Sequence, residues 1–245
     1  MKQFYVITIF PDIIDSYVKE SIIGRAIKAK KLAVKAVNPR DFSRDKHHKT
    51  DHRPYAGGPG MVMTAEPILR AVEKIERTLS PRQLPGAKKE GESLSQTNVR
   101  KRTEIIILSP SGKQFTNREA IKLAKSKKDL IFIAGRYEGI DARVKKILKA
   151  KEYSIGPYVL TGGELPALSM IDAITRQVPG VLGAEESLEE KRVSSSEMYT
   201  RPEVLIWKNK KYPVPKVLLS GDHKKIDEWK RKSQGPVDNV DRGRG

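Results

Sequence analysis

Short apolar runs alternate with amphipathic stretches along much of this chain. Residues 4–9 and 32–37 are predicted to be strands, and the segment from about 13 to 30 between them has apolar residues at helical spacing. A further helix is predicted over residues 67–79, with its apolar residues facing inward. Strands that alternate with helices in this way predict an α/β fold.

Three apolar runs in the middle of the chain each lead directly into a loop rich in Gly or Pro. Residues 105–108 precede SPSG (109–112), residues 130–133 precede AGRYEG (134–139), and residues 153–160 run into TGGELP (161–166). Glycines leave backbone N–H and C=O groups bare, so that a ligand can lie against the main chain. Because open α/β sheets bind ligands where their strands end, the three loops together predict a pocket. Three ordinary turns are the alternative.

The last of these units continues into a helix predicted over about residues 166–177. Asp172 and Arg176 are four residues apart on it and share a face, so an ion pair is the ordinary interpretation. Residues 1–182 are thus predicted to form one large domain.

Three other segments break the alternation of strands and helices. Residues 80–104 are poor in apolar side chains and are predicted to be a disordered basic insertion. Residues 183–198 are charged and serine-rich, which is typical of a flexible linker. Residues 199–245 are predicted to form a small helical domain around Val217, Leu218, Leu219, Ile226 and Trp229.

The composition indicates the kind of partner and excludes several kinds of site. The chain of 245 residues has 48 Lys and Arg against 30 Asp and Glu, a formal net charge of +18, which favours a polyanionic partner over a merely basic protein. The chain has no cysteine, which excludes disulfides and thiolate metal sites. No apolar run approaches the roughly 20 residues that span a bilayer. We therefore expect a cytoplasmic protein without a membrane partner.

Seven motifs, in order along the chain, carry a resemblance to one family. They are ESIIGRA (20–26), GGPGMVM (57–63), GRYEGID (135–141), IGPYVLTGGELP (155–166), PGVLG (179–183), YTRPEV (199–204) and VLLSGDH (217–223). The chain resembles the bacterial tRNA (guanine-N1-)-methyltransferases, the TrmD family, over nearly its whole length.

The resemblance implies a function and a fold. The function would be methylation of guanine N1 at tRNA position 37, next to the anticodon, with S-adenosyl-L-methionine as methyl donor. The fold would be an α/β SPOUT-type sheet with a deep trefoil knot, in an obligate homodimer. The linker and the C-terminal tRNA-binding domain of one chain would cover the pocket of the other. The dinucleotide fingerprint G-x-G-x-x-G is absent from the sequence.

The resemblance also implies binding residues. The residues expected to contact the cofactor or complete its cleft are Leu108, Ser109, Gly135, Gly139, Ile155, Gly156, Pro157, Tyr158, Val159, Leu160, Gly162 and Gly163. Tyr137 and Tyr158 could equally be packing aromatics. The residues expected near RNA are Asp51, Arg53, Gly58 and Pro59. The basic segment 40–53 also holds His47, His48 and His52, but no carboxylate spacing there supports a metal site, and none is predicted.

Methylation of guanine N1 needs a general base, and a cation near O6 to stabilise the charge that develops. The resemblance assigns the cation to Arg176. The family's base is an Asp in the linker, where this chain has Lys191. Three glutamates lie nearby: Glu189, Glu190 and Glu197. Glu190 needs the smallest shift of the alignment to reach the position of the family's aspartate, and it is the expected base.

Two other functions remain open. One is a catalytically impaired RNA-binding relative that has lost the usual linker aspartate. The other is a SPOUT methyltransferase with another RNA target, against which the C-terminal match argues.

Overall fold

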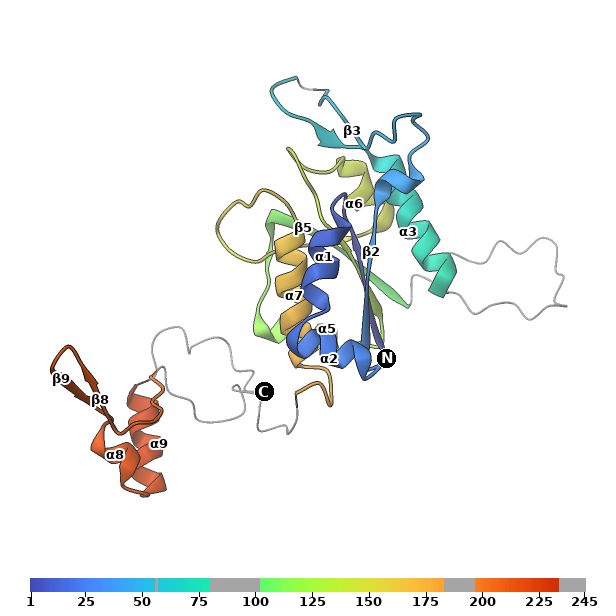
Figure 1. Cartoon of the computed structure of the whole chain (residues 1–245). Helices are drawn as coiled ribbons and strands as arrows, with labels where there is room; N and C mark the ends of the chain where they lie inside the picture. Colours follow the sequence, from blue (N-terminus) through green and yellow to red (C-terminus); the bar gives the residue numbers. More distant parts are fainter. Residues whose placement is uncertain (56, 80–101, 183–196, 234–245) are drawn as a thin grey trace, which may run out of the picture. The chain divides into compact units, whose positions relative to one another are not determined.

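The computed structural model describes residues 1–55, 57–79, 102–182 and 197–233 (Figure 1). The chain divides into two compact units, Met1–Val181 and Leu182–Gly245. None of the described helices is long and apolar enough to cross a bilayer.

The first unit is a mixed α/β structure built on a five-stranded parallel sheet. Its strands are β1 (Lys2–Ile7), β2 (Leu32–Val37), β5 (Thr103–Gln114), β6 (Asp129–Ile133) and β7 (Lys151–Ser154), in the order β2-β1-β6-β5-β7. The first two apolar runs that precede Gly- and Pro-rich loops lie in β5 and β6. Of the third run, 153–160, only Tyr153 and Ser154 lie in a strand, β7. These strands are neighbours in the sheet, as predicted.

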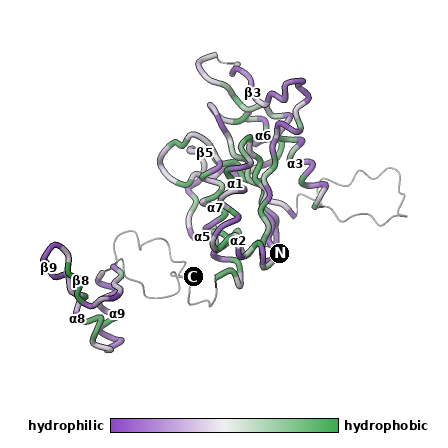
Figure 2. Tube along the Cα trace, viewed as in Figure 1, coloured by the Kyte–Doolittle hydropathy of each residue, from purple (hydrophilic) through white to green (hydrophobic). Residues whose placement is uncertain are grey.

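Helices cover both faces of this sheet because its strands are apolar on both sides. One face carries α1 (Pro11–Val18), α2 (Ser21–Lys28), α5 (Asn117–Lys125) and α7 (Glu164–Arg176); the other carries α3 (Ala65–Leu79) and α6 (Ala142–Leu148). Along β1, Phe4 and Val6 point into the first layer, and Tyr5 and Ile7 point into the second. Figure 2 shows hydrophobic residues concentrated where strands and helices pack together.

A 3₁₀ turn η1 (Pro39–Phe42) and a small ribbon of β3 (Asp51–His52) and β4 (Val62–Met63) complete the first unit.

The single helix expected over residues 13–30 is two helices. α1 ends at Val18 and α2 begins at Ser21. At Gly24 of α2, the position of a Cβ would overlap the carbonyl oxygen of Lys19, so the close joint between the helices needs a glycine. The apolar periodicity runs across the break because both helices bury residues in the same cluster, among them Ile14 and Ile23.

β5 corrects two expectations from the sequence. Thr103 and Glu104, assigned to the disordered insertion, are the first residues of this strand, and Thr103 is buried. Residues 80–101 of that segment lie outside the described residues. The loop at 109–112 is a bulge within β5, because both Leu108 and Lys113 are in register with Tyr153. A Cβ at Gly112 would lie 2.6 Å from the main-chain nitrogen of Tyr153.

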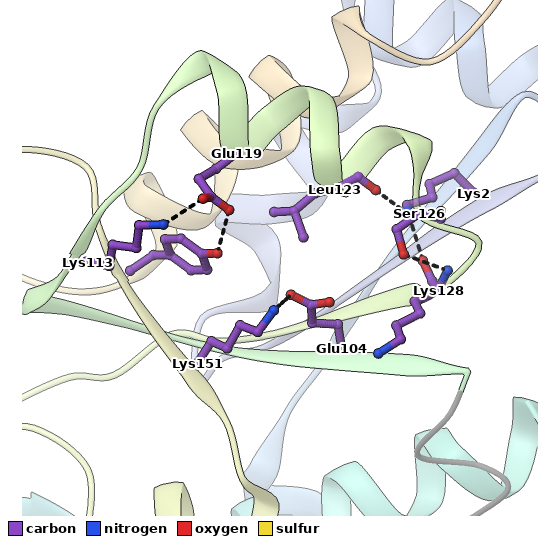
Figure 3. A network of polar contacts seen from close by, with 9 residues as sticks. Lys2, Glu104, Lys113, Glu119, Leu123, Ser126, Lys128 and Lys151 are labelled. Atoms are coloured by element: carbon purple, nitrogen blue, oxygen red, sulfur yellow. Dashed lines mark hydrogen bonds and ion pairs between the residues drawn. The ribbon is translucent and has the colours of Figure 1, made fainter. Parts of the chain in front are cut away.

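Lys2 ties the start of β1 to the end of α5 (Figure 3). Its Nζ donates hydrogen bonds to the carbonyl oxygens of Leu123 (2.7 Å), Ser126 (2.8 Å) and Lys128 (2.6 Å). The last carbonyls of a helix have no partner within the helix, so an ammonium group is a suitable cap for them. Burial lowers the pKa of Lys2 below its usual value.

The second unit differs from the purely helical domain that was expected. Its helices α8 (Lys216–Leu219) and α9 (His223–Lys232) follow an antiparallel hairpin of β8 (Val204–Trp207) and β9 (Lys210–Pro213). Ile226 is half-buried, and Trp229, also half-buried, contacts Tyr199 with ring centroids 6.1 Å apart. Segments 183–196 and 234–245 lie outside the described residues.

Candidate functional site

A cavity of about 950 Å³ is lined by the residues that follow β6 and β7 and by the bulge of β5. The residues expected in the cofactor cleft that line it are Leu108, Ser109, Gly135, Gly139, Ile155, Tyr158, Val159, Leu160, Gly162 and Gly163. Gly156 and Pro157 are not among its lining residues. One cavity therefore gathers loops from three adjacent strands, at the sheet edge where α/β proteins bind ligands.

The glycines that were expected in the cofactor cleft have different surroundings. Gly139 has a φ of +127°, and no atom lies within 4 Å of the place a Cβ would take. Its own backbone groups are paired, because its N–H donates to Arg136 O (3.1 Å) and its carbonyl accepts from Met63 N (2.9 Å). Gly156, in contrast, leaves room for the ring of Tyr158, and Gly162 leaves room for the side chain of Arg136. Gly163 lies against the backbone, since a Cβ there would be 2.6 Å from Ala134 Cα. The space beside Gly162 and Gly163 is thus taken by Arg136 and by backbone, and their contact with a ligand stays a prediction.

Arg136, which lines the cavity, forms an ion pair with the buried Glu164. Arg136 Nε lies 2.9 Å from Glu164 Oε2, and the Glu164 side chain is 1% exposed. The other carboxylate oxygen accepts a 2.6 Å hydrogen bond from Thr8 Oγ1. Arg136 also donates to the carbonyl of Thr161 at 3.2 Å, and its guanidinium lies 4.6 Å from the ring centroid of Phe10. The pair therefore joins the loops after β6 and β7 to the end of β1.

Tyr137 links the cavity to a residue expected near RNA. It has a φ of +58°, a conformation that costs a bulky residue roughly 1–2 kcal/mol and has to be held by its surroundings. Burial raises the pKa of the Tyr137 phenol, and a hydrogen bond with Asp51 raises it further. The phenol therefore stays neutral at physiological pH, half-exposed at the cavity.

Main-chain hydrogen bonds connect the turn at 57–61 to the same loop. Glu138 N donates to Met61 O (3.0 Å), Met63 N donates to Gly139 O (2.9 Å), and Asp141 N donates to Met63 O (3.0 Å). Gly58 and Pro59, which precede these hydrogen-bonded residues in the chain, are exposed. Arg53 lines a second cavity of about 850 Å³, together with Tyr55 and Arg143. Asp51 and the turn, both expected near RNA, thus connect directly to the loop that lines the first cavity.

Tyr153 forms part of the cavity wall and is held by residues that sequence reasoning missed. Its hydroxyl donates to Glu119 Oε2 at 3.0 Å, and Lys113 Nζ donates to Glu119 Oε1 at 2.6 Å. The hydrogen bond from Lys113 holds the pKa of Glu119 below its usual value. Burial and the bond to Glu119 raise the pKa of Tyr153 above its ordinary range. The hydroxyl is therefore a fixed neutral donor.

The expected catalytic residues are not brought to the cavity within the described part of one chain. α7 begins at Glu164, beside the cavity, and ends at Arg176, about 18 Å further along the helix axis at 1.5 Å per residue. Arg176 does not line the cavity. Asp172 accepts a 2.9 Å hydrogen bond from Tyr17 Oη, and its ion pair with Arg176 stays a prediction. Glu189, Glu190 and Lys191 lie outside the described residues, and Glu197 accepts a 2.8 Å bond from Tyr199.

Within the part of the chain that the structure describes, no group of three or more His, Asp or Glu is arranged to hold a metal ion.

Comparisons with known proteins agree on one family. The family profile described as tRNA (Guanine-1)-methyltransferase TrmD matches residues 1–242. A tRNA (guanine-N(1)-)-methyltransferase of Pseudoalteromonas atlantica is 42% identical over 94% of this chain and 79% of its own length. Proteins of the same name from Clostridioides difficile and Moorella thermoacetica are 42% and 44% identical, over 94% and 92% of this chain and 90% and 82% of their own.

Proposed function

We propose that this chain, which belongs to the TrmD family of tRNA (guanine-1)-methyltransferases, transfers a methyl group to guanine N1 at position 37 of tRNA. The observation that carries the proposal is the single cavity lined by three strand-end loops, whose 138–141 segment is hydrogen-bonded to Met61 and Met63. A small-molecule site and an exposed glycine-rich turn thereby meet. An enzyme that transfers a group from a small-molecule cofactor to a nucleotide has to bring two such sites together.

The cavity fits S-adenosyl-L-methionine, which when bound supplies an electrophilic methyl group. Its volume of about 950 Å³ lies within the range usual for ligand pockets. Apolar side chains such as Leu108 and Leu160 offer an adenine ring contact area. The Arg136–Glu164 pair holds the loops in place.

The guanine requires two further groups from the protein. Removal of its N1 proton needs a base, and the charge that moves onto O6 is stabilised by a cation, for which we propose Arg176. Because Arg176 lies at the far end of α7 from the cavity of its own chain, we infer that a second copy of this chain supplies it. The proposal therefore includes a homodimer, as the resemblance to the family implies.

The remaining assignments rest on the family and on charge. The SPOUT trefoil knot belongs to the proposal and rests on membership of the family. The net charge of +18 supports tRNA as the partner. We propose Asp51, Arg53, Gly58 and Pro59, with the C-terminal unit, as tRNA contacts.

The proposed activity is tested by methyl transfer. The purified protein is incubated with labelled S-adenosylmethionine and a tRNA transcript that carries guanosine at positions 36 and 37. We expect 1-methylguanosine at position 37 by nuclease digestion and mass spectrometry, and no incorporation into a transcript with adenosine at that position. Absence of incorporation into the first transcript would reject the proposal.

A bulky residue at position 162 should weaken cofactor binding. In Gly162→Val the new side chain occupies the space of the Arg136 side chain, so that the loops bordering the cavity shift. Overpacking of this kind costs about 1–3 kcal/mol, so we expect a rise of about tenfold in the Kd of S-adenosylmethionine by calorimetry. Ser169→Val, at an exposed position of α7, is the matched control and should bind normally. Unchanged affinity in Gly162→Val would show that the Arg136 side chain can move aside without altering the cofactor site.

The linker base can be identified with three variants. If Glu190 removes the N1 proton, Glu190→Gln should lower turnover by about two orders of magnitude, the usual contribution of a general base. The Kd of S-adenosylmethionine should not change. Glu189→Gln and Glu197→Gln serve as controls with smaller expected effects. Normal turnover in all three would show that no linker carboxylate is the base.

A further inference from the structure

The hairpin of the second unit has one face that combines aromatic rings with a lysine. Residues paired across antiparallel strands point to the same side of a sheet. The pairs Leu205–Tyr212 and Trp207–Lys210 therefore share one face, and the alternate pairs Val204–Pro213 and Ile206–Lys211 share the other. Trp207 and Tyr212 are diagonal neighbours on the first face, which we call the aromatic face.

The aromatic face is open to solvent. Every residue of β8 and β9 is exposed, and Trp207 and Tyr212 are exposed to 62% and 51%. Trp207 is one of only two tryptophans in the sequence. In Figure 2, β8 is mostly hydrophobic and β9 mostly hydrophilic. Large aromatic side chains that are this exposed mark an interaction surface.

The chemistry around these rings identifies the partner. Lys208, Lys210 and Lys211 occupy the turn and the start of β9, and residues 199–233 contain ten Lys and Arg against four Asp and Glu. Lys208 and Asn209 both have positive φ (46° and 60°), the geometry of a tight two-residue turn that fixes the lysines close to Trp207. Such a surface repels a second copy of itself and attracts phosphates.

We propose that the aromatic face is a stacking platform for unpaired bases of the tRNA substrate, with Lys210 on the same face and Lys208 in the turn on the adjacent phosphates. Aromatic rings beside cations are the usual means by which proteins hold single-stranded nucleic acid. The inference rests on the proposed tRNA methyltransferase activity and adds a contact outside the cavity that holds the cofactor. Trp207 and Tyr212 position the substrate and take no part in the chemistry.

The first experiment uses Trp207 as its own reporter. Trp229→Phe leaves Trp207 as the only tryptophan, and this variant of the full chain is titrated with a ten-nucleotide oligouridylate. Stacking should quench the fluorescence of Trp207. The matched variant Trp207→Phe, which reports only from the half-buried Trp229, should show little quenching. A Trp207 signal that the oligonucleotide leaves unchanged would overturn the proposal.

The second experiment compares the two faces of the hairpin by kinetics. Trp207→Ala and Tyr212→Ala should each raise the KM for tRNA about tenfold, the effect usual for loss of one stacked base. The turnover at saturating tRNA and the Kd of S-adenosylmethionine should stay unchanged. Ile206→Ala, equally exposed on the opposite face, should leave the KM unchanged. Thermal unfolding and sedimentation of each variant show whether fold and oligomer are preserved.

These outcomes separate the two proposals. If the unsubstituted chain transfers no methyl group, the proposed activity fails. If that chain is active and Trp207→Ala keeps its KM for tRNA, the platform fails and the activity stands. If Trp207→Ala instead weakens self-association at unchanged affinity for tRNA, the aromatic face binds protein, and the platform is likewise rejected.

Discussion

Arg176→Ala is expected to lower methyl transfer by two to three orders of magnitude. The negative charge that develops on guanine O6 would lose its counter-charge, and contributions of this type are worth about 3–4 kcal/mol. The Kd of S-adenosylmethionine should be unchanged, because the proposed partner of Arg176 is guanine O6 and not the cofactor. Single-turnover kinetics with tRNA in excess measure the effect. Arg25→Ala, which removes another arginine from the last turn of a helix in the same unit, is the control.

Co-expression shows whether Arg176 acts on the cavity of a second chain. Arg176→Ala is combined with Gly139→Val, which places a side chain in the cavity at a backbone φ of +127°. Each variant alone should be inactive. If the site is shared, a mixed dimer contains one site with both an intact cavity and an intact arginine, and activity returns. Co-expressed variants that remain inactive would mean that each chain uses its own Arg176.

Glu164→Gln is expected to destabilise the first unit by about 3 kcal/mol, because it leaves the Arg136 guanidinium without its buried counter-charge. The expected loss is at the low end of the range for broken buried pairs, since the Arg136 side chain is 20% exposed. Urea denaturation followed by circular dichroism measures the change. Glu73→Gln is the control, because its pair with Arg77 is exposed and such pairs contribute at most about 1 kcal/mol. Equal losses in the two variants would contradict the structural role of Glu164.

The strands and helices that the sequence predicts correctly are those set by local periodicity. The runs before the first two loops and the start of the third run lie in adjacent parallel strands, and residues 32–37 form β2 as expected. Periodicity was misleading where a main-chain contact decides the structure. The break between α1 and α2 depends on Gly24 against Lys19, and the bulge of β5 depends on Gly112 against Tyr153. Neither contact changes the apolar pattern.

In the candidate site, too, the features set by local sequence were predicted and those set by distant contacts were missed. Most of the predicted cleft residues line one cavity because the ends of adjacent parallel strands meet. The residues that hold the cleft were missed, since Glu119 and Tyr153, or Thr8 and Glu164, are far apart in sequence and only the fold brings them together. Trp207 and Tyr212 were missed because a hairpin with both faces exposed lacks the apolar–polar alternation of a half-buried strand.

The place of β1 in the sheet affects how the chain is made. β1 pairs on one side with β2 and on the other with β6, where Phe4 to Ile7 meet Leu130 to Ile133. At a ribosome speed of about 5–20 residues per second, β6 is synthesised roughly 5–20 s after β2. During that interval the nascent chain carries an apolar strand with an open edge, a state prone to aggregation. We therefore expect chaperones to protect this edge until translation has passed Ile133.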